Sequence, residues 1–248
     1  MVKLFFPVAI AFAFGSFGWW LAAQEVPMHA PDGGTTETLQ SIDITSVPNA
    51  PFSATVVTVW TRILPDGSTQ TNKNHRTVAR DSSGRVFQER RSLTPDGDRE
   101  VTRLTEMDYQ YPNQHQLYIC HPAVQVCTVY PYNPSPAIIT PMAGPLPTPT
   151  GSVTVEDLGR KTVEDLEVLG SRQTTTINAG VVGNQRAEPT IKEFWFSPRL
   201  QINLITKRFD PHVSGIQDFE VTSINQDEPD PKLFQVPADY RLIRMDQQ

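Results

Sequence analysis

The stretch EFWFSPRLQINLITKR, residues 193–208, decides the fold. A Ser-Pro pair separates two apolar runs, and proline lacks the N–H group that a central strand must donate. In the second run, Leu200, Ile202 and Leu204 alternate with polar residues, which is the period of a β-strand with one buried face. The pair of runs therefore predicts an antiparallel hairpin that covers a core on one side.

The same two-residue period recurs along most of the chain. Strands are expected at residues 54–63, 69–80, 85–93, 152–157, 166–178, 190–196, 200–208 and 215–225. Pro-Asp-Gly turns follow the first and third of these, and glycine supplies the positive φ that such turns need. The pattern predicts a mainly β fold (β-rich α+β), with a strongly bent antiparallel sheet or half-open β-barrel and little helix.

The N-terminal residues predict export. Lys3 precedes an uncharged apolar run, residues 4–23, and small residues stand where a signal peptidase would cut. Cleavage near Ala23 is expected; because the run is about as long as a membrane span, an uncleaved anchor is the alternative. We expect a signal peptide at 1–23, a flexible polar segment at 24–50 and a single half-barrel domain at 51–245. The destination would be the periplasm or cell envelope.

The charge of the chain excludes one class of partner. The formal net charge is −6, and removal of the leader with Lys3 makes it more negative. A negative protein repels phosphate backbones. Nucleic acid is therefore not expected as a partner.

Two kinds of segment depart from the simple strand pattern. Residues 131–150 contain seven prolines, which predicts a connection or a flap over the sheet rather than a central strand. The strands at 69–80 and 171–178 carry polar residues at the positions of both faces. They are expected to be solvated or to line a wet surface.

The two cysteines predict a disulfide. A hairpin with a two-residue turn at 123–124, or a four-residue loop at 122–125, sets Cys120 opposite Cys127 at a distance that a disulfide accepts. In an oxidising compartment such a pair closes. A metal site would need Cys120 and His121 on the same side of a strand, where adjacent residues point apart, so no metal is expected.

The local signatures of catalysis are missing from the sequence. No nucleophile elbow, phosphate-binding glycine loop, dinucleotide fingerprint or zinc-protease motif occurs. The acidic pairs Glu156-Asp157 and Glu164-Asp165 lie in a hydrophilic turn region, where such pairs are usually solvated. We therefore expect no enzyme, no catalytic residue and no cofactor.

The closing stretch EPDPKLFQVPADYRL, residues 228–242, resembles the C-terminal signature of the lipoprotein-carrier superfamily, the LolA/LolB/RseB-type half-open barrels. Three further stretches are similar to a group of uncharacterised exported bacterial proteins: DGSTQTNKNHRTVARDSSGRVFQERR, VEDLGRKTVEDLEVLGSRQTTTINAGVVGN and EFWFSPRLQINLITKRFDP. The resemblance implies a bent antiparallel sheet closed on one side by helices, with acyl chains in its concavity. It also implies that the Leu-Phe pair tucks under the sheet.

Two functional hypotheses follow. The first is an exported module that binds an apolar ligand, a lipid or a lipoprotein acyl chain, on the concave face. The candidate wall residues, which fill the core or line a cavity, are Trp60, Phe194, Phe196, Leu200, Ile202 and Leu204. The alternative is a protein-interaction or stress-sensor module of the RseB kind, without bound lipid, that engages another envelope protein.

Overall fold

The computed structural model describes residues 42–98, 101–134, 143–146, 149–211 and 215–245. All of them belong to the unit Leu39–Gln248. The strands of these ranges are β1 (Phe52–Ile63), β2 (Thr69–Arg80), β3 (Val86–Arg91), β4 (Leu104–Tyr111), β5 (Gln116–His121), β6 (Val126–Pro131), β7 (Gly144–Pro145), β8 (Gly151–Val163), β9 (Leu166–Ile177), β10 (Glu188–Ser197), β11 (Ile202–Asp210), β12 (Gly215–Asn225) and β13 (Arg241–Arg244). Two short 3₁₀ turns, η1 (Pro112–Gln114) and η3 (Pro231–Phe234), accompany them.

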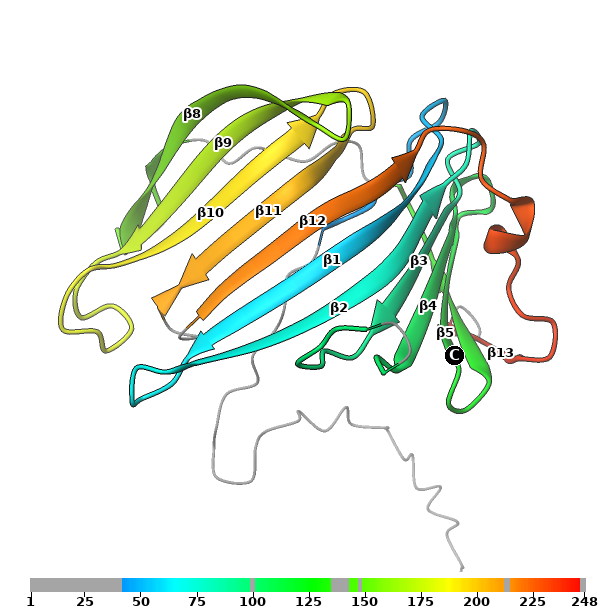
Figure 1. Cartoon of the computed structure of the whole chain (residues 1–248), viewed down its shortest axis with the longest axis horizontal. Helices are drawn as coiled ribbons and strands as arrows, with labels where there is room; N and C mark the ends of the chain where they lie inside the picture. The colour runs from blue at the N-terminus through cyan, green and yellow to red at the C-terminus, as the bar shows by residue number, and fades with distance from the viewer. Residues whose placement is uncertain (1–41, 99–100, 135–142, 147–148, 212–214, 246–248) are drawn as a thin grey trace, which may run out of the picture. The chain divides into compact units, whose positions relative to one another are not determined.

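The strands form one strongly curved sheet (Figure 1). Its order is β13-β6-β5-β4-β3-β2-β1-β12-β11-β10-β9-β8-β7, and the two end strands do not pair with each other. All neighbours are antiparallel except β13 and β6. The prediction of a mainly β, strongly bent, half-open sheet is confirmed. The described ranges contain no α-helix, so the helices that the resemblance implied are not found in them.

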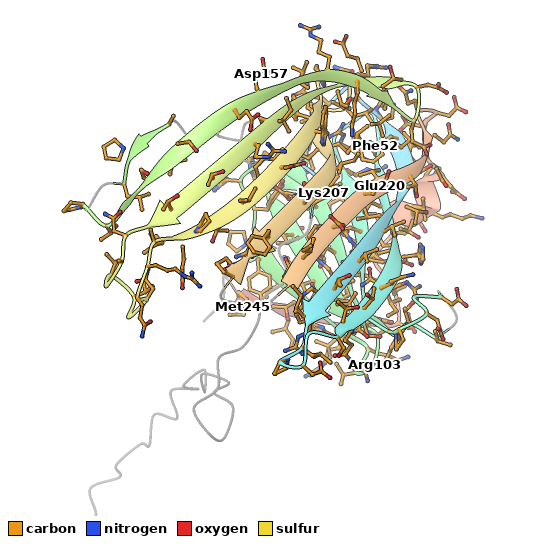
Figure 2. The ribbon with its side chains drawn as sticks, turned by 60° about the vertical axis from the view of Figure 1, so that its left-hand side comes forward. Phe52, Arg103, Asp157, Lys207, Glu220 and Met245 are labelled. Atoms are coloured by element: carbon orange, nitrogen blue, oxygen red, sulfur yellow. A yellow bond between two sulfur atoms is a disulfide. The ribbon has the colours of Figure 1, made fainter. Side chains whose placement is uncertain are left out.

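Arg80 shows which face of the sheet is concave. Two strands lie between β2 and β11, so a flat sheet would separate them by about 14 Å, beyond the reach of a side chain. Yet Arg80 Nη2 donates to the carbonyl of Leu200, just before β11, at 2.5 Å. The sheet therefore bends toward the face that carries Arg80. Figure 2 shows the same bend, with the green strands behind the orange β11 and β12.

An extended segment, residues 42–50, crosses this concave face. Arg80 donates from Nε to the carbonyl of Ala50 at 2.9 Å and from Nη1 to that of Thr45 at 2.8 Å. Ile42 and Ile44 are buried in the core. The end of the segment predicted to be flexible and polar is thus packed, because its carbonyls accept from a buried guanidinium and its isoleucines join the core. Residues 24–41 lie outside the described ranges.

The main core fills the part of the concave face that is lined by the first half of β1 and the start of β11. Its buried members come from the crossing segment and from both halves of the sheet: Ile42, Ile44, Phe52, Ala54, Val56, Val78, Val86, Leu166, Val168, Leu200, Ile202, Leu204, Phe219 and Val221. The inward parity of the predicted hairpin, Leu200, Ile202 and Leu204, is fully buried. One buried face for this hairpin is confirmed.

The prediction that residues 69–80 are solvated or line a wet surface was wrong for the second half of β2. Asn74, Arg76 and Arg80 are buried. Most of their donors bond to backbone carbonyls of other segments, as when Asn74 Nδ2 donates to the carbonyl of Arg91 at 2.8 Å. Asn74 Oδ1 has no partner among the described residues. Sequence periodicity cannot show such partners, since they come from distant parts of the chain.

The C-terminal segment packs on the convex face of the first strands. Asp230 caps η3 by accepting from the amide of Lys232, and proline occupies the first position of the turn. Phe234 is buried there, and the hydroxyl of Tyr111 donates to its carbonyl. The convex cluster consists of Ala79, Phe87, Tyr109, Cys120, Cys127 and Phe234, with Leu233 packed against it. The Leu-Phe pair does tuck under the sheet.

Cys120 and Cys127 form the predicted disulfide. They are directly opposed on β5 and β6, as predicted. The four residues 122–125 connect the strands, which is the second of the two predicted connections. Cys120 is buried whereas His121 is exposed, because adjacent strand residues point to opposite faces.

Several predicted segments lie outside the described ranges. These are the signal peptide, residues 1–23, and residues 135–142 and 147–148 of the proline-rich connection. The described part of the connection contains β7, which pairs with β8. Among the described residues, no helix has the length and apolar character needed to cross a membrane.

Replacing Arg80 tests how strongly the crossing segment is held. Arg80→Met removes three hydrogen bonds and leaves three carbonyls without their donor, so the free energy of unfolding should fall by about 3 kcal/mol. Urea titration measures the change. Lys207→Met, which alters an exposed cation on the outer side of β11 (Figure 2), should stay within about 0.5 kcal/mol. Equal effects would contradict the anchoring role.

Candidate functional site

A row of polar side chains crosses the concave face beside the core, toward the C-terminal end of β1. The register pairs Lys192 on β10 with Arg208 on β11, Arg208 with Gln217 on β12, and Gln217 with Trp60 on β1. Directly opposed residues share one face of a sheet. Gln217 also alternates with Phe219 of the core on β12. The four residues, called the polar row below, therefore lie side by side on the concave face.

Three members of the polar row carry buried polar atoms without a partner among the described residues. They are Trp60 Nε1, Arg208 Nε and both amide atoms of Gln217. Gln217 is only 1% exposed. A buried amide without a hydrogen bond costs about 1–3 kcal/mol, so this arrangement is unfavourable in the unliganded fold.

The charges of the polar row are incompletely balanced. Arg208 Nη2 donates to Asp210 Oδ2 at 2.7 Å. In the part of the chain that the structure describes, Lys192 makes no ion pair. Burial, and then the charge of Arg208, lower the pKa of Lys192, while Asp210 opposes the shift. The row thus combines two cationic side chains with one neighbouring carboxylate.

Large aromatic side chains border the polar row. Two residues along each strand from the polar row, toward the core, Phe194 opposes Thr206, which in turn opposes Phe219. The indole of Trp60 lies against β12, since a Cβ on Gly215 would stand 3.2 Å from Trp60 Nε1. The site therefore joins apolar rings to unpaired hydrogen-bond donors, which is the composition of a small-molecule site.

A second polar cluster on the concave face, on β2 to β5, is by contrast connected. Gln88 accepts from Arg76 Nη1 at 3.2 Å and donates to Asp108 Oδ2 at 3.0 Å. Arg90 Nε also donates to Asp108, at 3.1 Å. Burial first, and then Asp108, raise the pKa of Glu106 to about 7. Most groups of this cluster are bonded to one another, and Asp108 Oδ1 has no partner among the described residues.

The structure separates the six predicted wall residues into two groups. Leu200, Ile202 and Leu204 are fully buried members of the core. Trp60, Phe194 and Phe196 are half-buried. Trp60 belongs to the polar row and Phe194 borders it, whereas Phe196 opposes Asn203 and Leu169. Ligand binding by these residues stays a prediction, and only Trp60 and Phe194 lie at the candidate site.

Sequence reasoning missed Lys192, Arg208 and Gln217. A signal was available for two of them. On β12, Gln217 alternates in step with the apolar residues Phe219 and Val221. On β11, Arg208 does so with Ile202 and Leu204. A polar residue at a strand position that faces the core indicates a buried polar site. Trp195 packs against the core, and Gly170 inside β9 leaves room for its indole.

A second concavity lies on the convex side, between the C-terminal segment and β4 and β5. It has a volume of about 580 Å³. Three tyrosines, Tyr111, Tyr118 and Tyr240, line it together with Phe234 and Arg85. The guanidinium of Arg85 lies 5.1 Å from the centre of the Phe234 ring and binds Asp81 at 2.6 Å.

Metal chemistry has little support in the described ranges. No group of three or more His, Cys, Asp or Glu side chains there could hold an ion. The polar row presents donors, which a cation does not need.

Comparisons with known proteins give a likeness of fold only. No family model matches the chain, and no curated protein matches it. Among solved structures, an uncharacterized conserved protein from Thermus thermophilus has a TM-score of 0.41 and 11% identity, with 79% of this chain and 91% of that chain covered.

Two further solved structures are similar to this chain in fold. The MucA/MucB complex of Pseudomonas aeruginosa has a TM-score of 0.39 and 13% identity, with 78% of this chain and 58% of that chain covered. The LolA superfamily protein NE2245 from Nitrosomonas europaea has a TM-score of 0.33 and 10% identity, with coverage of 77% and 92%. These likenesses carry no information on the ligand of this chain.

Two buried glutamines on the concave face provide a matched test of the site. Gln217→Leu removes an unpaired amide and should raise the free energy of unfolding by about 1 kcal/mol or more. Gln88→Leu removes a paired amide and should lower it by about 2 kcal/mol. Urea unfolding of the unliganded protein measures both. Destabilisation by both variants would show that Gln217 has a partner.

Glu106 makes stability depend on pH. Its pKa is raised from 4.5 to about 7, so the stability contributed by its neutral form is fully present below about 4.5 and is lost as the pH rises through about 7. Glu106→Gln should therefore be more stable than the wild type at pH 8, with a smaller difference at pH 5, in urea titrations. Glu220→Gln, on the exposed outer face (Figure 2), is the control. A difference for Glu106→Gln that is the same at both pH values would contradict the raised pKa.

Proposed function

We propose that this chain is an exported envelope protein that binds an apolar or amphipathic ligand, a lipid or a lipoprotein acyl chain, on the concave face of its sheet. The observation that carries the proposal is the polar row, where the amide of Gln217 is buried without a partner beside Trp60. Phe194 lies two residues from Lys192, at the β10 end of the same row. Folding rarely leaves such an amide unpaired unless another molecule completes it.

The position of the site supports this proposal. The core and residues 42–50 fill one part of the concave face. A ligand would therefore bind beside them, along the polar row from β10 to β1. Export fits the disulfide, since such bonds persist in oxidising compartments, and it fits the N-terminal leader pattern.

Lipid extraction tests the function directly. The protein is purified from its own envelope fraction without detergent, and co-purifying lipid is identified by mass spectrometry. After delipidation it should also bind a fluorescent fatty acid. Phe194→Ala should weaken this binding about tenfold, because an aromatic wall contact is lost.

Phe209→Ala provides the matched control. Phe209 is exposed and pairs with Ile216, on the opposite face of β11 and β12 from the polar row, so its removal should leave binding unchanged. A protein that is free of lipid and also fails to bind the fluorescent fatty acid would contradict the proposal.

That negative result would favour a second candidate function, a module that engages another envelope protein. The observation in its favour is the concavity beside the C-terminal segment, which Tyr111, Tyr118 and Tyr240 line together with Arg85. Tyrosine and arginine are enriched at protein interfaces.

A further inference from the structure

The polar row of the proposed ligand site has an excess of hydrogen-bond donors. Arg208 Nε and Trp60 Nε1 are buried N–H groups without an acceptor among the described residues, and Gln217 Nε2 is a third. The only unpaired acceptor that the described residues place in the row is Gln217 Oε1. A ligand that completes the row must therefore bring acceptor oxygens.

Charge selects among such ligands. Lys192 and Arg208 are direct cross-strand neighbours, so their two positive charges lie on the same face at short distance. One carboxylate, Asp210, binds Arg208. A like-charge pair at a half-buried position is unfavourable, and an anion placed between them would relieve it.

We infer that Lys192, Arg208, Gln217 and Trp60 form a binding site for the anionic oxygen group, a carboxylate or a phosphate, of an acidic amphiphile. The inference rests on the proposed function, because it assigns the head group of the ligand whose apolar part lies on the concave face. Lys192 and Arg208 supply charge, and the Gln217 amide and the Trp60 indole supply directional hydrogen bonds.

The surroundings place the two ends of this ligand. Phe194 is half-buried and lies two residues from Lys192 on β10, so the apolar chain runs against its ring while the head group stays on the row. Charge-assisted hydrogen bonds to such a head are stronger than neutral ones. A neutral head of the same size loses that advantage.

Dodecyl compounds that differ only in the head group test the inference on the delipidated full mature chain. Dodecanoate, dodecyl phosphate and dodecanol are titrated below their micelle concentrations at pH 8, and binding is followed by calorimetry. At least one anionic compound should bind about tenfold or more tightly than dodecanol. Preference for dodecanoate identifies a carboxylate ligand, and preference for dodecyl phosphate identifies a phosphate ligand.

Variants connect that preference to the row. Lys192→Met keeps the side-chain stem and should abolish most of the difference between the anionic compounds and dodecanol. Gln217→Met should reduce it. Lys207→Met removes the same charge from the outer face of the neighbouring strand (Figure 2) and should retain it. Thermal unfolding of each variant shows that the fold is kept.

The outcomes separate the two levels of proposal. If dodecanol binds as tightly as the anionic compounds, the anion site is wrong and ligand binding on the concave face stands. If none of the three compounds binds, both the proposed function and the anion site fail. If the preference survives in Lys192→Met but is lost in Lys207→Met, the charge acts from the outer face and the inference is overturned.

Discussion

The guanidinium of Arg80 connects three parts of the chain that are far apart in the sequence. It donates to carbonyls of residues 45, 50 and 200, and its central carbon lies 5.1 Å from the centre of the Phe52 ring. Burial lowers the pKa of Arg80 to about 10, so the side chain remains charged at neutral pH. A buried charge is tolerated only when its donors are used, and here all three nitrogens have acceptors. The curvature of the sheet and the path of the crossing segment both depend on this arrangement.

That curvature divides the concave face into two regions. In one region, the crossing segment and the hairpin of β10 and β11 bury apolar side chains beside the buried Arg76 and Arg80. In the region of the polar row, no comparable segment of the described ranges bonds to the row, and Trp60 Nε1, Arg208 Nε and Gln217 Nε2 stay unpaired. The contrast with Gln88, whose amide is bonded at both ends, shows that this sheet can satisfy a buried glutamine. The unpaired state of Gln217 is therefore a property of the site.

The two faces of the sheet are completed by different segments. Residues 42–50 close part of the concave side, and the C-terminal segment with η3 closes the convex side over β3 to β5. The disulfide belongs to the convex cluster, next to the covering segment, and away from the polar row. Its role is accordingly structural, and it lies apart from the proposed binding site on the concave face.

Local chemistry made much of the fold predictable. The alternation of residues 200–208, the Pro-Asp-Gly turns and the spacing of the cysteines determined strands, turns and the disulfide, because side-chain period and turn conformation depend on neighbouring residues. The tertiary structure alone decided that the polar residues Asn74, Arg76 and Arg80 are buried and that Ile42 and Ile44 belong to the core. It also showed that three of the six predicted residues are fully buried in the core and three are half-buried, and it brought Lys192, Arg208, Gln217 and Trp60 into one row. Hydrogen-bond partners and cross-strand neighbours come from distant segments, and their positions follow from the register and bend of the whole sheet, which no local pattern encodes.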